Sequence, residues 1–245
     1  MFGPSIDKTS AWKAGTRYQD SMRLCIPMFS DGQGHRAVTN TTSARTVVTA
    51  GGSTLIDEQT EPCATVSGLP VKRTTYRIST DLTRDPALSR VTTHVVADWT
   101  FTSRRPARDV EEDLPLTTVR FTPRLTASST AKAGSTLRVP LTVEGAAPGS
   151  QLERLSVQVS YGGGDTWRPV RVQSGAGKSV VLHHPRGASS VSLRSVVEDK
   201  AGNVGRQTIY SAYRLDETIR TPTHGKQLTR RQRCGPVRYE TAGRC

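Results

Sequence analysis

The sequence LSVQVSYGGGDTWRPVRV, at residues 155–172, decides the fold. Apolar and polar side chains alternate along LSVQVSY, which is the pattern of a half-buried β-strand. Gly162, Gly163 and Gly164 then supply the positive φ angles that a tight hairpin turn needs. Trp167 begins the return strand, and we expect it on the apolar face as a core aromatic beneath the turn. The stretch therefore predicts an antiparallel hairpin in which these four residues have structural roles.

The same kind of pattern recurs along the chain. Residues 45–59 contain the hairpin signal Ala-Gly-Gly-Ser between two strand patterns, and residues 91–101 alternate with Trp99 on the apolar side. Residues 191–197 form another strand pattern and lead into the turn DKAGN at 199–203. Short strands separated by glycine, asparagine and aspartate turns, without a helical period, predict an all-β fold of antiparallel β-sandwiches.

Changes in composition divide the chain into two consecutive β-sandwich modules. The predicted parts are a lead-in at 1–15, an N-terminal β-sandwich module at 16–103, a linker at 104–116, a second β-sandwich at 117–215 and a basic disordered tail at 216–245. The linker is rich in charge and contains prolines, which is typical of a crossing between modules. An alternative for the tail is that it comes from a shifted reading frame.

The formal net charge of +13 raises the hypothesis of an anionic partner. The basic residues before the tail are scattered singly among strands, and their longest run is Arg104–Arg105. Scattered arginine is typical of solvated strand faces rather than of a nucleic-acid groove. We therefore predict that nucleic acid is not a partner, and keep a basic polyanion- or nucleic-acid-binding protein as the alternative function.

The cysteines are Cys25, Cys63, Cys234 and Cys245, and none of them forms a Cys-x-x-Cys pair that would indicate zinc or redox chemistry. Cys25 and Cys63 lie in the same module and form a candidate disulfide in an oxidising compartment. The sequence leaves that pairing open, because it does not fix the distance between the two Cα atoms.

Targeting signals do not stand out in the sequence. It has no apolar run long enough for a membrane-spanning helix, so we predict no membrane insertion. The first residues, MFGPSIDKTSAWKAG, lack the apolar centre of a signal peptide. As written, the chain would therefore be expected in the cytoplasm.

Candidate ligands and nucleophiles are few. Asp199 and Asn203 offer two oxygen ligands to calcium, which takes six to eight, so a β-turn with Gly202 at positive φ is favoured. His183 and His184 are adjacent and would point to opposite faces of a strand, so they cannot hold one metal together. No Gly-x-Ser-x-Gly nucleophile motif occurs. We predict no catalytic residue, no metal and no cofactor.

The segment SYGGGDTW at 160–167 is similar to the Asp-box of sialidases and other β-propellers, Ser-x-Asp-x-Gly-x-Thr-Trp. Gly162 stands where that motif has aspartate, and only one copy occurs, whereas propellers repeat it in each blade. A glycan-binding β-sandwich is the further alternative function that this segment suggests. No pair of carboxylates is placed for glycoside hydrolysis.

Several segments together carry a family resemblance. They are WTF at 99–101, LPLTTVRFTP at 114–123, VSYGGGDTW at 159–167, LHHPRGASSVSLRSVVEDKAGN at 182–203 and QTIYSAYRL at 207–215. In this order and spacing they resemble the C-terminal accessory region of large, secreted, bacterial subtilisin-like serine peptidases. In that family, β-sandwich modules of fibronectin type III or immunoglobulin-like type follow the protease domain. The resemblance covers residues 16–215.

The resemblance implies an extracellular, non-catalytic module that spaces or stabilises a protease domain, or that binds a polymeric substrate or a cell surface. The implied partners are the protease domain of the parent protein and an extracellular polymer or cell surface. The catalytic contexts of the family, Asp-Thr/Ser-Gly, His-Gly-Thr-His and Gly-Thr-Ser-Met-Ala, do not occur in this sequence. No residue of the catalytic triad is therefore carried over, and we expect a detached or truncated fragment of such a peptidase that is not itself an enzyme.

Overall fold

The computed structural model describes residues 3–6, 13–31, 35, 37, 39–147 and 149–218. This part of the chain consists of β-strands and one short 3-10 helix, η1 (Gly149–Gln151). Neighbouring strands run antiparallel, except that β10 is parallel to β16. The prediction of an all-β fold of antiparallel sheets is confirmed. The described residues include no helix with the length and hydrophobicity to span a membrane.

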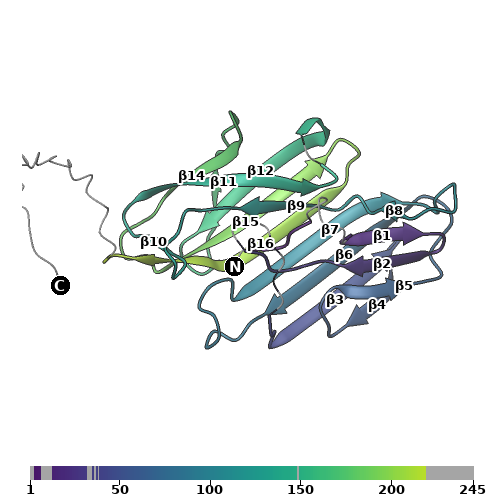
Figure 1. Ribbon diagram of the computed structural model, residues 1–245, viewed down its shortest axis with the longest axis horizontal. Coiled ribbons are helices and arrows are strands. Elements are labelled where there is room, and N and C mark those ends of the chain that lie inside the picture. The colour runs from purple at the N-terminus through teal and green to yellow at the C-terminus, as the bar shows by residue number, and fades with distance from the viewer. Residues whose placement is uncertain are drawn as a thin grey trace, which may run out of the picture.

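The largest sheet, called here the large sheet, runs through both halves of the chain. Its strand order is β13-β12-β15-β16-β7-β6-β3-β4, with β10 beside β16. Its strands are β3 (Ser43–Ala50), β4 (Ser53–Glu58), β6 (Thr74–Thr83), β7 (His94–Ser103), β10 (Thr130–Lys132), β12 (Leu152–Ser160), β13 (Arg168–Val170), β15 (Ser190–Asp199) and β16 (Val204–Asp216). β7 and β16 pair from Val204↔Thr100 to Tyr210↔His94, and lie side by side in Figure 1. Backbone hydrogen bonds therefore join the two predicted modules directly.

Two small sheets pack on one face of the large sheet. The first has the order β5-β2-β1-β8 and the second the order β14-β11-β9. Their strands are β1 (Gly15–Tyr18), β2 (Ser21–Cys25), β5 (Cys63–Val66), β8 (Glu112–Asp113), β9 (Thr117–Phe121), β11 (Thr136–Gly145) and β14 (Lys178–His183). β8 lies within the predicted linker and pairs with β1, so this crossing contributes an edge strand to the first module.

The core lies between the large sheet and the two small sheets, because each strand of the large sheet alternates buried and outward-facing side chains. On β7 the buried residues are Val95, Ala97, Trp99 and Phe101. Trp99 is 2% exposed, and its indole Nε1–H donates to the carbonyl oxygen of Thr117 on β9 at 2.9 Å. Trp99 is thus a buried residue of the first half that contacts a strand of the second.

A second buried contact between the large sheet and β9 comes from Gln207. Its side-chain amide donates to the carbonyl oxygen of Val119 and accepts a hydrogen bond from the hydroxyl of Thr118. Gln207 is buried on β16, so these bonds satisfy a polar side chain within the core. The bond to Val119 also occupies a backbone carbonyl on β9, an edge strand of the second small sheet.

The N-terminal residues correct the predicted lead-in. Residues 3–6 are buried, and the Ser5 hydroxyl and the Ile6 N–H donate to the Glu144 carboxylate at 2.9 and 3.0 Å. Arg120 also donates to Glu144. Residues 3–6 are thus a packed segment that ties the start of the chain to β11 in the second half, and the prediction of an unpacked lead-in was wrong for them.

The disulfide and the end of the chain complete the fold. Cys25 and Cys63 stand opposite each other in the register of β2 and β5, and their sulfur atoms are bonded. β16 continues to Asp216, so the regular structure extends one residue into the predicted tail. Residues 219–245, with Cys234 and Cys245, lie outside the described residues, as does most of the predicted disordered tail.

Candidate functional site

The predicted calcium ligands form a turn. Asp199 Oδ1 accepts hydrogen bonds from the N–H groups of Ala201 and Asn203, both at 2.9 Å, and Oδ2 accepts one from the Asn203 side chain at 2.8 Å. Gly202 adopts a φ of +82° within this turn. Both carboxylate oxygens of Asp199 therefore bond to N–H groups of the turn, as expected for the β-turn reading. Among the described residues, no group of three or more histidine, cysteine, aspartate and glutamate side chains could hold a metal ion.

The adjacent histidines point to opposite sides of the second small sheet. His183 is exposed and its Nδ1 lies 2.9 Å from the Thr136 hydroxyl. His184 is buried, with its ring nitrogens 3.3 Å from the Tyr161 hydroxyl and 3.4 Å from the Tyr213 hydroxyl. Burial, and to a smaller extent the nearby His183, lowers the pKa of His184 to about 4. Burial also raises the pKa of Tyr161 to about 12.

Trp167 corrects a second prediction, because it does not belong to the buried core. It is half-buried, and the guanidinium carbon of Arg194 lies over its ring, 4.0 Å from the centroid. Tyr210 meets the Trp167 ring edge-on at 6.3 Å and stacks on His94 at 4.6 Å. His94, Tyr210 and Arg194 alternate with the buried residues of β7, β16 and β15, so this aromatic row lies on the outer face of the large sheet.

The turn at Gly162–Gly164, before Trp167, explains how the aromatic row packs on the outer face. Gly163 and Gly164 have positive φ angles of 70° and 110°, whereas Gly162 does not. Two of the three glycines therefore adopt the left-handed conformation. The Ser160 hydroxyl accepts a hydrogen bond from the N–H of Gly164 at 3.0 Å. A Cβ atom on Gly164 would come within 2.5 Å of the Tyr210 ring. The absence of a side chain at Gly164 allows Tyr210 to pack against the turn.

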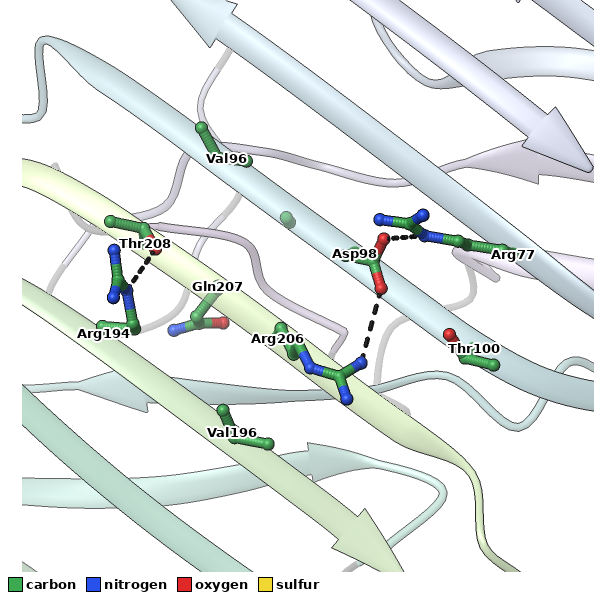
Figure 2. A pocket seen from close by; sticks show the side chains of 10 residues that line it. Arg77, Val96, Asp98, Thr100, Arg194, Val196, Arg206, Gln207 and Thr208 are labelled. Atoms are coloured by element: carbon green, nitrogen blue, oxygen red, sulfur yellow. Dashed lines mark hydrogen bonds and ion pairs between the residues drawn. The ribbon is translucent and has the colours of Figure 1, made fainter.

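A hollow of about 540 Å³, called here the arginine hollow, opens on the outer face beside this row (Figure 2). It crosses β6, β7, β16 and β15, and therefore spans the junction between the two halves. The side chains that line it and matter most here are Arg77, Val96, Asp98, Arg194, Val196 and Arg206. Of these six side chains, the two valines are apolar and the other four are charged.

The charges in the arginine hollow do not balance. Asp98 lies between Arg77 and Arg206 in Figure 2: it accepts a hydrogen bond from Arg77 and forms an ion pair with Arg206 at 3.6 Å. Ser79 also donates to Asp98, at 2.8 Å. Arg194 donates to the Thr208 hydroxyl at 3.2 Å and, among the described residues, has no carboxylate partner. The hollow thus holds three guanidinium groups and one carboxylate, which only Arg77 and Arg206 contact, and it carries a net positive charge.

Two other arginines on the outer face each have a carboxylate partner of their own. Arg45 pairs with Asp57 at 2.6 Å, and Arg154 pairs with Glu198 at 2.7 Å. On the same face, the His94 ring nitrogen lies 2.8 Å from Asp81. In the arginine hollow, by contrast, three guanidinium groups lie around one carboxylate. Guanidinium groups are planar donors that bind carboxylate, sulfate and phosphate through pairs of N–H bonds, so this chemistry suits an anionic ligand.

The sequence predicts these arginines only as solvated positions on strand faces. It does not predict that they lie close to one another. The alternation of β15 and β16 does place Arg194 and Arg206 on the outward side. Their approach to Arg77 and Asp98 depends on the pairing of β16 with β7, which joins residues distant in the sequence. Strand alternation alone does not identify that pairing.

Comparisons with known proteins find similar solved structures but no matching family. No protein-family model matches the chain, and no curated protein matches it. Among solved structures, the fibronectin(III)-like modules of CbhA from Clostridium thermocellum match with 12% sequence identity and a TM-score of 0.29. That match covers 88% of this chain and 97% of the CbhA chain. At this level of similarity it supports no inference about function, and the resemblance to accessory regions of subtilisin-like peptidases stays a prediction.

Proposed function

We propose that the chain is a non-catalytic accessory β-sandwich region of a larger secreted enzyme. The parent that its sequence segments resemble is a subtilisin-like serine peptidase. The observation that carries the proposal is the continuous large sheet, in which β7 and β16 join the two halves along a ladder from Val204↔Thr100 to Tyr210↔His94. Such a ladder resists hinge motion at the crossing between modules, because bending there would break several backbone hydrogen bonds together. A rigid unit of this kind suits a spacer or stabiliser that holds a neighbouring domain in a fixed place.

The disulfide supports a location outside the cytoplasm. Cys25 and Cys63 are bonded across β2 and β5, at an edge of the first small sheet. Structural disulfides form and persist in oxidising compartments and are rare in the cytoplasm. The proposed parent is therefore an exported protein.

The chemistry of the outer face supports binding rather than bond cleavage. The arginine hollow offers N–H donors and positive charge, and Thr208 there accepts a hydrogen bond from Arg194. Of the histidines in the described part, His94 is stacked on Tyr210 and near Asp81, while His184 is buried beside two tyrosines. These contacts give each of the two imidazoles a structural role, which agrees with an accessory unit.

Two measurements test the proposal. The purified chain is incubated with a fluorogenic peptide mixture, with and without a serine-directed fluorophosphonate, and no turnover above the buffer rate is expected. The chain is also fused after a subtilisin-like catalytic domain and compared with the same domain followed by a flexible linker of equal length. The fusion is expected to inactivate more slowly on heating or to cleave a polymeric substrate faster. Turnover that the inhibitor abolishes, or a fusion equal to the linker control in both assays, would contradict the proposal.

A further inference from the structure

We propose that the arginine hollow binds an anionic polysaccharide, a chain whose sugar units carry carboxylates, through Arg194, Arg206 and Arg77. This inference rests on the proposed function only in treating the chain as an accessory unit that holds an extracellular polymer. The residues that carry it lie on β15, β16 and β6, on the outer face that neither small sheet covers. Figure 2 shows the three guanidinium groups around the same hollow.

The strand register places these arginines along a diagonal of the sheet. Arg194 stands opposite Thr208, Arg206 opposite Asp98, and Arg77 opposite Thr100. With strands about 4.8 Å apart and about 3.4 Å per residue, the backbone positions of Arg194 and Arg206 are about 8 Å apart. Those of Arg206 and Arg77 are about 12 Å apart by the same geometry. This spread suits a chain with charges repeated along it better than one small anion.

The arginines differ in how far they are already neutralised. Arg77 and Arg206 share the carboxylate of Asp98, whose side chain is 13% exposed. Arg194 has its guanidinium over Trp167 and bonds to a neutral hydroxyl. The contacts with Trp167 and Thr208 restrict the Arg194 guanidinium, and a planar fork that is held in place loses little entropy when it binds a carboxylate. Arg194 is therefore the anchor of the site.

The surroundings favour a sugar chain over a single-stranded nucleic acid. Nucleic acids bind such surfaces by stacking bases on aromatic faces. In this row a face of Tyr210 is covered by His94 and a face of Trp167 by Arg194. A chain rich in hydroxyls can instead bond to the hydroxyls of Thr100 and Thr208, which line the hollow, while its ring carbons contact the two valines.

The surroundings also disfavour an extended acidic peptide. Peptides that add to β-sheets gain most of their affinity from backbone hydrogen bonds at an exposed sheet edge. The arginine hollow lies on the face of paired strands, where β16 is bonded to β7 on one side and to β15 on the other. A peptide there would leave its own backbone groups without partners from the sheet. The anionic sugar chain has no such requirement.

To test this, the full chain is titrated with oligogalacturonate, and the binding affinity is measured by calorimetry at low and at raised salt. Binding is expected to weaken as salt rises, because the contacts are ionic. Arg194→Ala is expected to bind about tenfold more weakly, the usual effect of losing a charged hydrogen-bonding group. Arg154→Ala is the matched control, since Arg154 lies on the same face but outside the hollow and is paired with Glu198. It is expected to bind as the parent does. All variants carry the same C-terminal tail, so its charge does not affect the comparison.

Arg194→Lys separates charge from shape: it keeps the positive charge and loses the planar fork, so its affinity is expected to lie between those of the parent and Arg194→Ala. Thermal unfolding of each variant checks that the sheet is intact. The proposal is overturned by absence of oligogalacturonate binding, by equal loss in Arg194→Ala and Arg154→Ala, or by tighter binding of neutral oligosaccharide, polyglutamate or single-stranded DNA. These outcomes are independent of the peptidase assay, so failure of this site and failure of the accessory function can be told apart.

Discussion

Trp99 and Thr117 join the two halves of the protein: the indole N–H of Trp99, on β7 of the large sheet, donates to the Thr117 carbonyl of β9 at 2.9 Å. The indole is buried, so its hydrogen bond satisfies a polar group that water does not reach. It therefore reinforces the backbone ladder between β7 and β16 from the inner side of the sheet.

Trp99→Phe is expected to lower the free energy of unfolding by about 1–3 kcal/mol, because it leaves a buried carbonyl without its donor and reduces packing. Urea unfolding followed by circular dichroism measures this change. The control is Trp167→Phe on the outer face, which is expected to cost less because Trp167 is half-buried. A larger loss for the Trp167 variant would contradict the assignment of Trp99 to the core contact.

Removal of the disulfide is expected to destabilise the fold by about 3–4 kcal/mol. The bond closes a loop with a sequence separation of 38, and cross-links of that length restrict the unfolded chain by about this much. Cys25→Ser/Cys63→Ser is compared with the parent in urea, and the parent is also measured in the presence of a reductant. Reduction of the parent should reproduce the stability of the double variant; if reductant leaves the parent unchanged, the bond does not form in solution.

His184 is expected to make the protein less stable in mild acid. Its pKa is lowered to about 4 in the folded state, so the unfolded chain binds the proton more readily between that value and the ordinary value of 6.5. The stabilisation from the neutral ring is complete above pH 6.5 and is lost as the pH falls from 6.5 towards 4. His184→Phe should flatten this part of the stability curve, measured by urea unfolding at several pH values. The exposed His183→Gln variant should keep most of the slope of the parent, because burial is the main cause of the lowered pKa of His184. A slope as flat as that of His184→Phe in this variant would contradict the assignment.

Asp199 is expected to act through its turn and not through calcium. Asp199→Ala removes the acceptor of three hydrogen bonds in the turn between β15 and β16, and should lower stability by about 1–3 kcal/mol. Added calcium should leave the melting temperature of the parent unchanged. A calcium-dependent rise in the parent that disappears in Asp199→Ala would restore the ligand interpretation.

Alternation in the sequence was enough to predict much of the fold. It placed Val95, Trp99 and Phe101 on one buried side of β7, and the Ala-Gly-Gly-Ser signal marked the β3–β4 hairpin. These features depend on neighbours in the chain, so a local pattern contains them. The ladder between β7 and β16 joins distant segments, and several pairings of the strands would have buried the same apolar faces.

For Trp167, the sequence predicted the hairpin but placed the side chain on the wrong face of it. Trp167 was expected on the apolar face of the hairpin, but it lies three residues before Val170, and an offset of three turns two side chains of a strand to opposite faces. In the structure Val170 stands opposite the buried Val157, which leaves Trp167 on the outer side beside Arg194. The arginine hollow was missed for a different reason, because its members become neighbours only once the pairing of β16 with β7 is known.

The ladder between β7 and β16 also limits how this protein can be divided by recombination. A gene broken at the crossing between the modules would yield two pieces, each with a long central strand newly exposed at a sheet edge. Unpaired strands of this length are templates for aggregation. The two modules are therefore expected to be exchanged between genes as one unit, both together or neither.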